Sequence, residues 1–199
     1  NRHSANFLRP SSPVLRVMSE FLQLKNLYRQ GWLKRSVPDS ACESVADHSF
    51  STALLCLFLA DNCFPSADRD RIVRMALIHE AGEVYAGDIT PVDGVSPEEK
   101  HARERDSALR VFAGLPQAPE YLALWEEFEE NLTPEARIVK QADRLEMLLQ
   151  ATVYEKLGYH DFEEFFANTR PLMKDSKFRA LFEEVRKTRL PETQEKIQQ

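Results

Sequence analysis

The chain is poor in glycine and cysteine: its 199 residues include six glycines and three cysteines. Few glycines, and no long stretch in which polar and apolar residues alternate, argue against a sheet and predict an all-helical domain. Cys42, Cys56 and Cys63 lack a CxxC spacing, and an odd number of cysteines argues against a disulfide framework. We therefore expect free thiols in a reducing compartment.

The chain also lacks a long hydrophobic run and an excess of positive charge. Its longest apolar run, residues 53–60, is far shorter than the roughly 20 residues that span a bilayer. The first residues contain no apolar segment typical of a signal peptide, so we expect a cytoplasmic protein with no membrane partner. A net charge of -6 disfavours a nucleic-acid partner, although a small anionic ligand needs only local positive groups.

Capping signals and apolar periodicity predict where the helices lie. Ser44 with Asp47 forms the pattern of a capping box, and Thr133-Pro134-Glu135 combines an N-cap with a proline at the first helical position. The length fits one domain over residues 1–199, with its core at about 15–160 and closing helices at 161–190. The predicted helices cover about residues 13–30, 45–63, 67–86, 97–113, 117–130, 134–151, 161–168 and 175–188, and residues 32–38 form an ordered loop.

Residues 76–91 concentrate the side chains that could do chemistry. On a helix, residues three and four apart share a face, so Glu83 lies beside both His79 and Glu80. A glycine then ends the helix and places Asp88 in the following turn. This stretch predicts the edge of a cleft that carries a histidine and several carboxylates.

Four potential metal ligands, His48, His79, Glu80 and Asp143, occur in apolar segments of three predicted helices. Burying so many polar groups costs several kcal/mol unless each finds a partner, and a divalent cation would satisfy them together. A mixed nitrogen and oxygen set suits Mn, Co, Fe, Ni or Zn. Spacing alone leaves open the alternative that each is a hydrogen-bonded core residue.

The sequence around these residues resembles the H…HD…D signature of HD-domain phosphohydrolases. The resemblance covers about residues 15–160. Within that family, the sequence is similar in particular to the 5′-deoxynucleotidase branch. The matching motifs include Glu-Ser-Val-Ala-Asp-His-Ser at 43–49, Glu-Val-Tyr-Ala-Gly-Asp-Ile-Thr-Pro at 83–91 and Val-Lys-Gln-Ala-Asp at 139–143.

The resemblance implies an all-α HD-domain helical bundle that removes the 5′-phosphate from deoxynucleoside 5′-monophosphates. It implies a divalent metal, such as Mn, Co or Mg, and a homodimer. Carried over residue by residue, it assigns the metal to His48, His79, Glu80 and Asp143, catalysis to Glu83 and Asp88, and substrate binding to Trp32, Arg35 and Thr90. A second divalent ion would lie at Glu83, Asp88 and the backbone carbonyl of Ile89.

Two positions depart from the family pattern. Gly31 stands where the bacterial enzymes carry an arginine that orients the phosphate, so we expect other residues to orient it, with Arg29 and Lys34 as competitors of Arg35. Glu80 stands where the signature has an aspartate, and its extra methylene moves the carboxylate by roughly 1.5 Å.

Three alternatives follow from Glu80. It ligates the metal with adjusted torsions, it binds the metal less tightly or selects another, or the chain is a catalytically impaired nucleotide-binding HD protein. A di-iron oxygenase on the same scaffold would need further histidines between His79 and Asp143, and that interval offers only His101.

Overall fold

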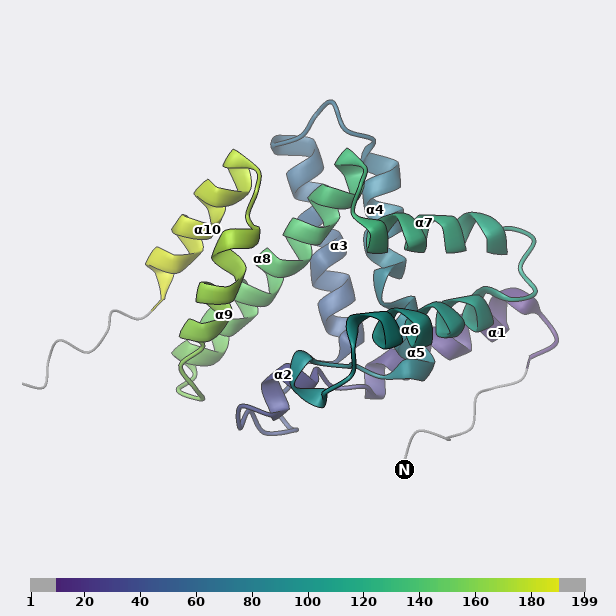
Figure 1. The fold of residues 1–199 in the computed structure, drawn as a ribbon, viewed down its shortest axis with the longest axis horizontal. Helices are drawn as coiled ribbons and strands as arrows, with labels where there is room; N and C mark the ends of the chain where they lie inside the picture. The colour runs from purple at the N-terminus through teal and green to yellow at the C-terminus, as the bar shows by residue number, and fades with distance from the viewer. Residues whose placement is uncertain (1–9, 190–199) are drawn as a thin grey trace, which may run out of the picture.

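The described part of the chain, residues 10–189 of the computed structural model, consists of helices and short connections (Figure 1). This confirms the all-helical prediction. Strand pairing in this part is limited to an isolated bridge between Tyr28 and Ser44. None of its helices is long and apolar enough to cross a membrane. The ends of the predicted domain, residues 1–9 and 190–199, lie outside the described residues.

The α-helices are α1 (Pro13–Phe21), α2 (Gln30–Leu33), α3 (Val45–Asn62), α4 (Arg69–Ile78), α5 (Glu83–Ala86), α6 (Pro97–Phe112), α7 (Ala118–Glu130), α8 (Pro134–Lys156), α9 (Glu163–Thr169) and α10 (Ser176–Thr188), and the 3-10 helices are η1 (Leu22–Asn26), η2 (His79–Gly82), η3 (Pro91–Asp93) and η4 (Arg170–Leu172).

The helices α3, α4 and α8 pack on one another at the centre of the molecule (Figure 1). The first of them begins at the predicted cap. The Asp47 backbone amide donates to the Ser44 hydroxyl at 3.1 Å, and the Ser44 amide donates to the Asp47 carboxylate at 2.9 Å. This capping box satisfies two amides that the helix leaves free. Side chains from the three helices form the main core, which includes Ala53, Cys56, Leu59, Ile72, Met75, Ala142, Leu145 and Leu148.

Two groups of helices cover this centre from opposite sides in Figure 1. On one side α9 and α10 pack on α8, and Phe166, Phe178 and Phe182 extend the main core. On the other side α6 packs against α1 and α7. A smaller core lies there, built from Val17, Ala81, Ala108, Val111, Phe112 and Trp125.

The predicted helix over residues 13–30 is wrong in its second half. It ends as α1, turns through η1 and then becomes extended. The Val45 amide donates to the Leu27 carbonyl at 2.8 Å, and the Arg29 amide donates to the Glu43 carbonyl at 3.1 Å. Pairing with the segment before α3 therefore replaces the helix and sets Arg29 beside the first turn of α3.

The predicted end of this helix at residue 30 is also wrong, because Gln30 begins the short helix α2 and Gly31 lies within it. The same short helix takes up Trp32 and Leu33, the start of the predicted loop over residues 32–38. The Trp32 side chain explains the local order, because it is 2% exposed and packs edge-on against three aromatic rings of the C-terminal part.

The predicted helix over residues 67–86 is interrupted and forms α4, η2 and α5 in turn. In a continuous helix the Tyr85 amide would donate to the Ala81 carbonyl. Here the Ser107 hydroxyl of α6 stands between them, accepting from the Tyr85 amide at 3.0 Å and donating to the Ala81 carbonyl at 3.2 Å. A side chain inserted into the backbone ladder is a known cause of helix kinks.

The interrupted segment packs directly on α6 and α7. The Trp125 indole donates to the His79 carbonyl at 3.1 Å. A Cβ on Gly82 would lie 2.7 Å from the Glu104 Cβ, so only glycine allows α6 to approach this closely. Gly87, at a φ of 80°, then ends α5. These contacts fix the direction in which His79 points.

Candidate metal centre

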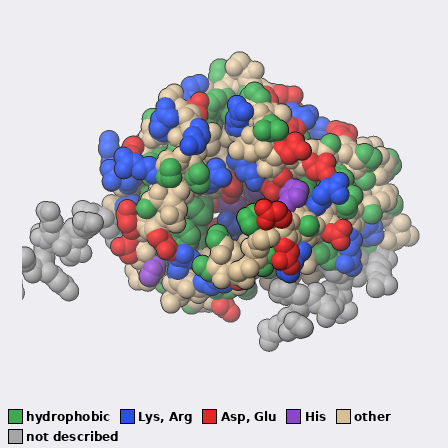
Figure 2. Space-filling view, in the orientation of Figure 1, with side chains coloured by type: hydrophobic (Ala, Val, Ile, Leu, Met, Phe, Trp, Pro, Cys, Tyr) green, Lys and Arg blue, Asp and Glu red, His purple; other side chains and the backbone are tan. Residues whose placement is uncertain are grey.

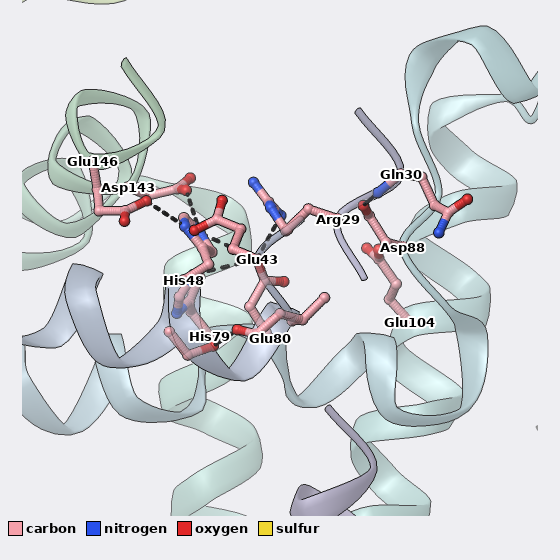
Figure 3. Close-up of polar contacts among 12 residues, drawn as sticks. Arg29, Gln30, Glu43, His48, His79, Glu80, Asp88, Glu104, Asp143 and Glu146 are labelled. Carbon is pink, nitrogen blue, oxygen red and sulfur yellow. Dashed lines mark hydrogen bonds and ion pairs between the residues drawn. The ribbon is translucent and has the colours of Figure 1, made fainter. Parts of the chain in front are cut away.

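Two buried histidines face each other at the meeting point of α3, η2 and α8 (Figure 3). His48 is 0% exposed and His79 is 3% exposed. The His48 Nδ1 lies 2.6 Å from a Glu146 carboxylate oxygen, and the His79 Nδ1 lies 2.7 Å from the Ala76 carbonyl oxygen. Both acceptors bind an N–H, so each ring carries a hydrogen on Nδ1 and directs Nε2 to the other side.

The two Nε2 atoms are buried and have no hydrogen-bond partner among the described residues. Asp143 completes the group, with one oxygen 3.1 Å from the His48 Nε2. One donor atom from each of the three residues lies within 4.8 Å of the other two. Donors that share one transition metal ion lie about 3 to 4 Å apart. The residues present therefore fit a divalent ion, and they match three of the four predicted ligands.

Glu80, the fourth predicted ligand, points to the same place. One of its oxygens lies 3.4 Å from the His79 Nε2 and 3.6 Å from the His48 Nε2. The same oxygen lies 3.3 Å from the Arg29 guanidinium. Burial opposes ionisation of Glu80, but the neighbouring histidines and Arg29 hold its pKa well below the usual range. The carboxylate is thus ionised and shared between the metal site and Arg29.

The charges of His48 and Asp143 depend on each other. Burial and Arg29 lower the pKa of His48, but contacts with Asp143 and Glu146 outweigh them and raise it to about 10. Burial also acts against the Asp143 carboxylate, yet His48 and His79 hold its pKa below the usual range. A metal ion that binds His48 must displace a proton, so metal affinity decreases as the pH falls.

A cavity of about 660 Å³ opens above this centre, and Figure 2 shows a hollow with acidic and basic side chains inside it. The predicted catalytic residues Glu83 and Asp88 line it. Glu83 is 4% exposed, and its Oε2 has no hydrogen-bond partner among the described residues. Burial, with Glu80 and Asp88 nearby, raises the pKa of Glu83 well above the usual range. Asp88 is held in place because it accepts the Gln30 backbone amide at 2.6 Å.

The other predicted site residues also line the cavity, but several have structural partners. Ile89 lines it beside Asp88. The Thr90 hydroxyl lies 2.7 Å from Asp93 and 2.6 Å from the Lys34 ammonium, so it closes the turn at η3. The Trp32 indole donates to Glu43 at 2.7 Å while the ring fills the core.

Arg35 links α2 to α9. It forms an ion pair with Glu164, donates to the Gly31 carbonyl at 2.9 Å and lies over the Phe165 ring at 4.3 Å. A guanidinium with these partners is largely occupied. The structure therefore places Arg35 in the wall of the cavity, and its predicted role in substrate binding would require it to leave or share Glu164.

Sequence reasoning missed Glu146 and underestimated Arg29. Glu146 follows Asp143 by three residues on α8, so helical spacing could have shown that both point toward His48. Arg29 could not be placed, since its position depends on backbone pairing with the segment before α3. His101, the one further histidine considered for a di-iron centre, stacks on Trp125 and belongs to none of the three-donor groups within the described residues.

Two buried imidazoles and a carboxylate that converge inside a helical bundle define a helical metal-binding protein. The chain belongs to the HD domain family, whose model matches residues 21–186. This confirms the family resemblance stated from the motifs.

Curated relatives and solved structures agree with this membership. The chain is 38% identical to 5′-deoxynucleotidase HDDC2 of Danio rerio over 160 residues, which cover 78% of either chain. It is 33% identical to 5′-deoxynucleotidase YBR242W of Saccharomyces cerevisiae, over 81% of this chain and 69% of that protein. The crystal structure of the PH0347 protein from Pyrococcus horikoshii has a TM-score of 0.76 at 30% identity, covering 88% of this chain and 99% of that one. A predicted metal-dependent phosphohydrolase from Magnetospirillum magnetotacticum has a TM-score of 0.67 at 31% identity, covering 90% and 97%.

Glu104, on the cavity wall, gives the folded protein a pH-dependent stability. Burial raises its pKa to about 7 from 4.5, partly opposed by Lys100 and reinforced by Glu129 and Glu80. At a pH between these two pKa values, Glu104 thus keeps its proton in the folded state and has lost it in the unfolded state. The free energy of unfolding therefore falls as the pH rises through this interval, by at most about 3 kcal/mol.

We expect Glu104→Gln to remove this part of the pH dependence, measured by urea unfolding between pH 4 and 8 against the wild type. Glu98→Gln, at an exposed glutamate of the same helix, is the control and should keep the wild-type slope. Because the proteins share the metal centre, the difference in their free energies of unfolding at each pH does not contain the pH dependence of metal binding. An unchanged slope in Glu104→Gln would show that Glu104 titrates normally.

Proposed function

We propose that the chain is a metal-dependent phosphohydrolase that removes the 5′-phosphate from deoxynucleoside 5′-monophosphates. The observation that carries the proposal is the pair of buried, unpartnered Nε2 atoms of His48 and His79, which converge with Asp143 at a cavity. The curated relatives named above are 5′-deoxynucleotidases, which supplies the substrate class.

His48, His79 and Asp143, with Glu80 as the fourth ligand, would hold a divalent ion such as Mn, Co or Mg. When bound, such an ion polarises a phosphoryl oxygen and lowers the pKa of a water molecule. The protein supplies the orientation: Glu146 and the Ala76 carbonyl fix the two rings so that both Nε2 atoms point inward.

Glu83 is suited to move the proton of the reaction. Burial raises its pKa, which favours the protonated carboxyl, and its Oε2 has no hydrogen-bond partner among the described residues. A protonated carboxyl can donate to the leaving 5′-oxygen as the ester bond breaks. Asp88, held by the Gln30 amide, would orient the water or the sugar.

The remaining assignments concern the cavity wall. Trp32, Arg35 and Thr90 would contact the substrate, and a second divalent ion at Glu83, Asp88 and the Ile89 carbonyl remains a prediction. These residues line the same cavity, which supports the assignments.

A second candidate function is nucleotide binding without turnover. The contact between Glu80 and Arg29 favours it, because a carboxylate engaged by a guanidinium is a weaker metal ligand. This candidate predicts nucleotide binding in calorimetry with no release of phosphate. Measurable turnover would remove it.

The free cysteines support the predicted cytoplasmic location. Cys42 and Cys56 are buried, and Cys63 is partly buried. Burial raises the pKa of the Cys42 thiol to about 11, which keeps it protonated and unreactive. Unpaired thiols are typical of a reducing compartment.

The decisive assay is release of phosphate from a panel of deoxynucleoside 5′-monophosphates with Mn, Co or Mg. We expect release by the wild type, and a decrease of about 10²- to 10⁴-fold in Glu83→Gln with the ion at His48, His79 and Asp143 retained, because the proton-transfer group is lost. Glu130→Gln, at an exposed position of α7, should match the wild type. No release with any nucleotide and any metal would contradict the proposal.

We also propose a homodimer. Phe50, Leu54 and Phe58 follow one another at four-residue intervals on α3 and are 64%, 37% and 57% exposed, so they form an apolar stripe. Light scattering should give the mass of a dimer, and Phe50→Glu combined with Phe58→Glu should lower it to that of a monomer. A monomeric wild type would contradict this proposal.

A further inference from the structure

Five positively charged side chains line the cavity, and four of them already have carboxylate partners among the described residues. The nitrogen-to-oxygen separations are 3.3 Å for the pair at the metal centre, 3.4 Å for the lysine of α6 and 2.8 Å for the lysine of α8. The pairs are Arg29 with Glu80, Arg35 with Glu164, Lys100 with Glu104, and Lys140 with Glu129.

Arg144 is the exception. Within residues 10–189 it has no hydrogen bond and no ion pair, although it is partly buried in the cavity wall. It directly follows Asp143 on α8, and Lys140 and Met147, about one helical turn to either side, line the same cavity. The helix α8, which forms part of the main core, therefore holds Arg144 in the wall of the cavity that contains the metal centre.

The charges around the metal centre show why this arginine matters. Glu80, Glu83, Asp88 and Asp143 face the cavity, and the nearest cation, Arg29, is already surrounded by these carboxylates. Besides a bound divalent ion, a lining cation without a counter-ion favours the entry of a phosphate dianion into such a site. Arg144 is the lining cation that meets this condition in the described part of the chain.

We propose that Arg144 binds the 5′-phosphate of the substrate through oxygens that do not react. This inference rests on the proposed function, since it names the group that receives the phosphate of that substrate. A guanidinium presents two parallel N–H groups, which match two phosphate oxygens and fix the orientation of the ester. Partial burial strengthens the interaction because little water screens it.

The neighbouring cations are less suited to this role. Arg35 joins α2 to α9 through Glu164, and Lys140 is held both by Glu129 at 2.8 Å and over the Phe128 ring at 3.6 Å. Recruiting either would break an existing contact. Arg144 binds the phosphate without such a loss, so it also distinguishes phosphorylated ligands from the free deoxynucleoside.

The test compares Arg144→Gln and Arg144→Lys with Arg137→Gln, a control with the same change of charge at an exposed position two turns earlier on α8. Calorimetry measures binding of dAMP, inorganic phosphate and deoxyadenosine to the metal-loaded protein, and kinetics measure KM for dAMP. We expect Arg144→Gln to weaken dAMP and phosphate binding, and to raise KM, by tenfold or more. Deoxyadenosine binding and metal content should stay at the wild-type level, and Arg144→Lys should lie between.

Equal dAMP and phosphate affinity in Arg144→Gln and Arg137→Gln would overturn the inference. So would a wild type that binds neither ligand, whichever nucleotides it hydrolyses. An equal loss of deoxyadenosine binding would overturn it too, because it would indicate a general change of the cavity. If no nucleotide is hydrolysed but dAMP binding weakens only in the Arg144 variants, the proposed hydrolysis fails and the phosphate site stands.

Discussion

The structure depends on two imidazole rings that are buried with one nitrogen of each left unpaired. A buried polar atom without a partner costs on the order of 1 to 3 kcal/mol, and here two such atoms face each other beside Asp143. Burial of this kind is favourable only if a ligand satisfies the atoms together. The hydrogen bonds from the other ring nitrogens, to Glu146 and the Ala76 carbonyl, keep both rings in this orientation. The packing around the rings therefore prepares a metal site in advance.

The interruption after α4 is the local structure that makes this orientation available. The Ser107 hydroxyl replaces a direct backbone bond, and the Trp125 indole takes the His79 carbonyl. Glycine at position 82 lets α6 approach closely enough for these contacts. The helices α6 and α7 thus fix the conformation of the turn that carries His79, Glu80 and Glu83, although none of the candidate ligands lies on them.

Much of the fold could be predicted because its helices are marked locally. The capping box at Ser44 and the cap-proline signal at Thr133 lie at the observed starts of α3 and α8. The break within residues 67–86 could not be predicted, because its cause, Ser107, lies more than 20 positions away in the sequence.

The convergence of three candidate residues was predictable from the sequence, and the surroundings of the site were less so. His48, His79 and Asp143 are brought together as the motifs indicated. The ion-pair partners of Arg29 and Arg35 could not be predicted from the sequence, since each pair joins segments that meet only in the folded chain. Trp32 lines the cavity from the core, and its hydrogen bond to Glu43 could not be predicted from the sequence because the two residues meet only in the folded chain.

Glu80 is the residue that tests the proposed metal centre most directly, since its carboxylate lies near both imidazoles and Arg29. The most direct measurement is metal content and phosphate release on one purified sample, for the wild type and Glu80→Asp. We expect about one or more divalent ions per chain and comparable turnover in both proteins. A wild type that holds no metal, or activity that appears only in Glu80→Asp, would contradict the claim that these side chains form a working metal centre.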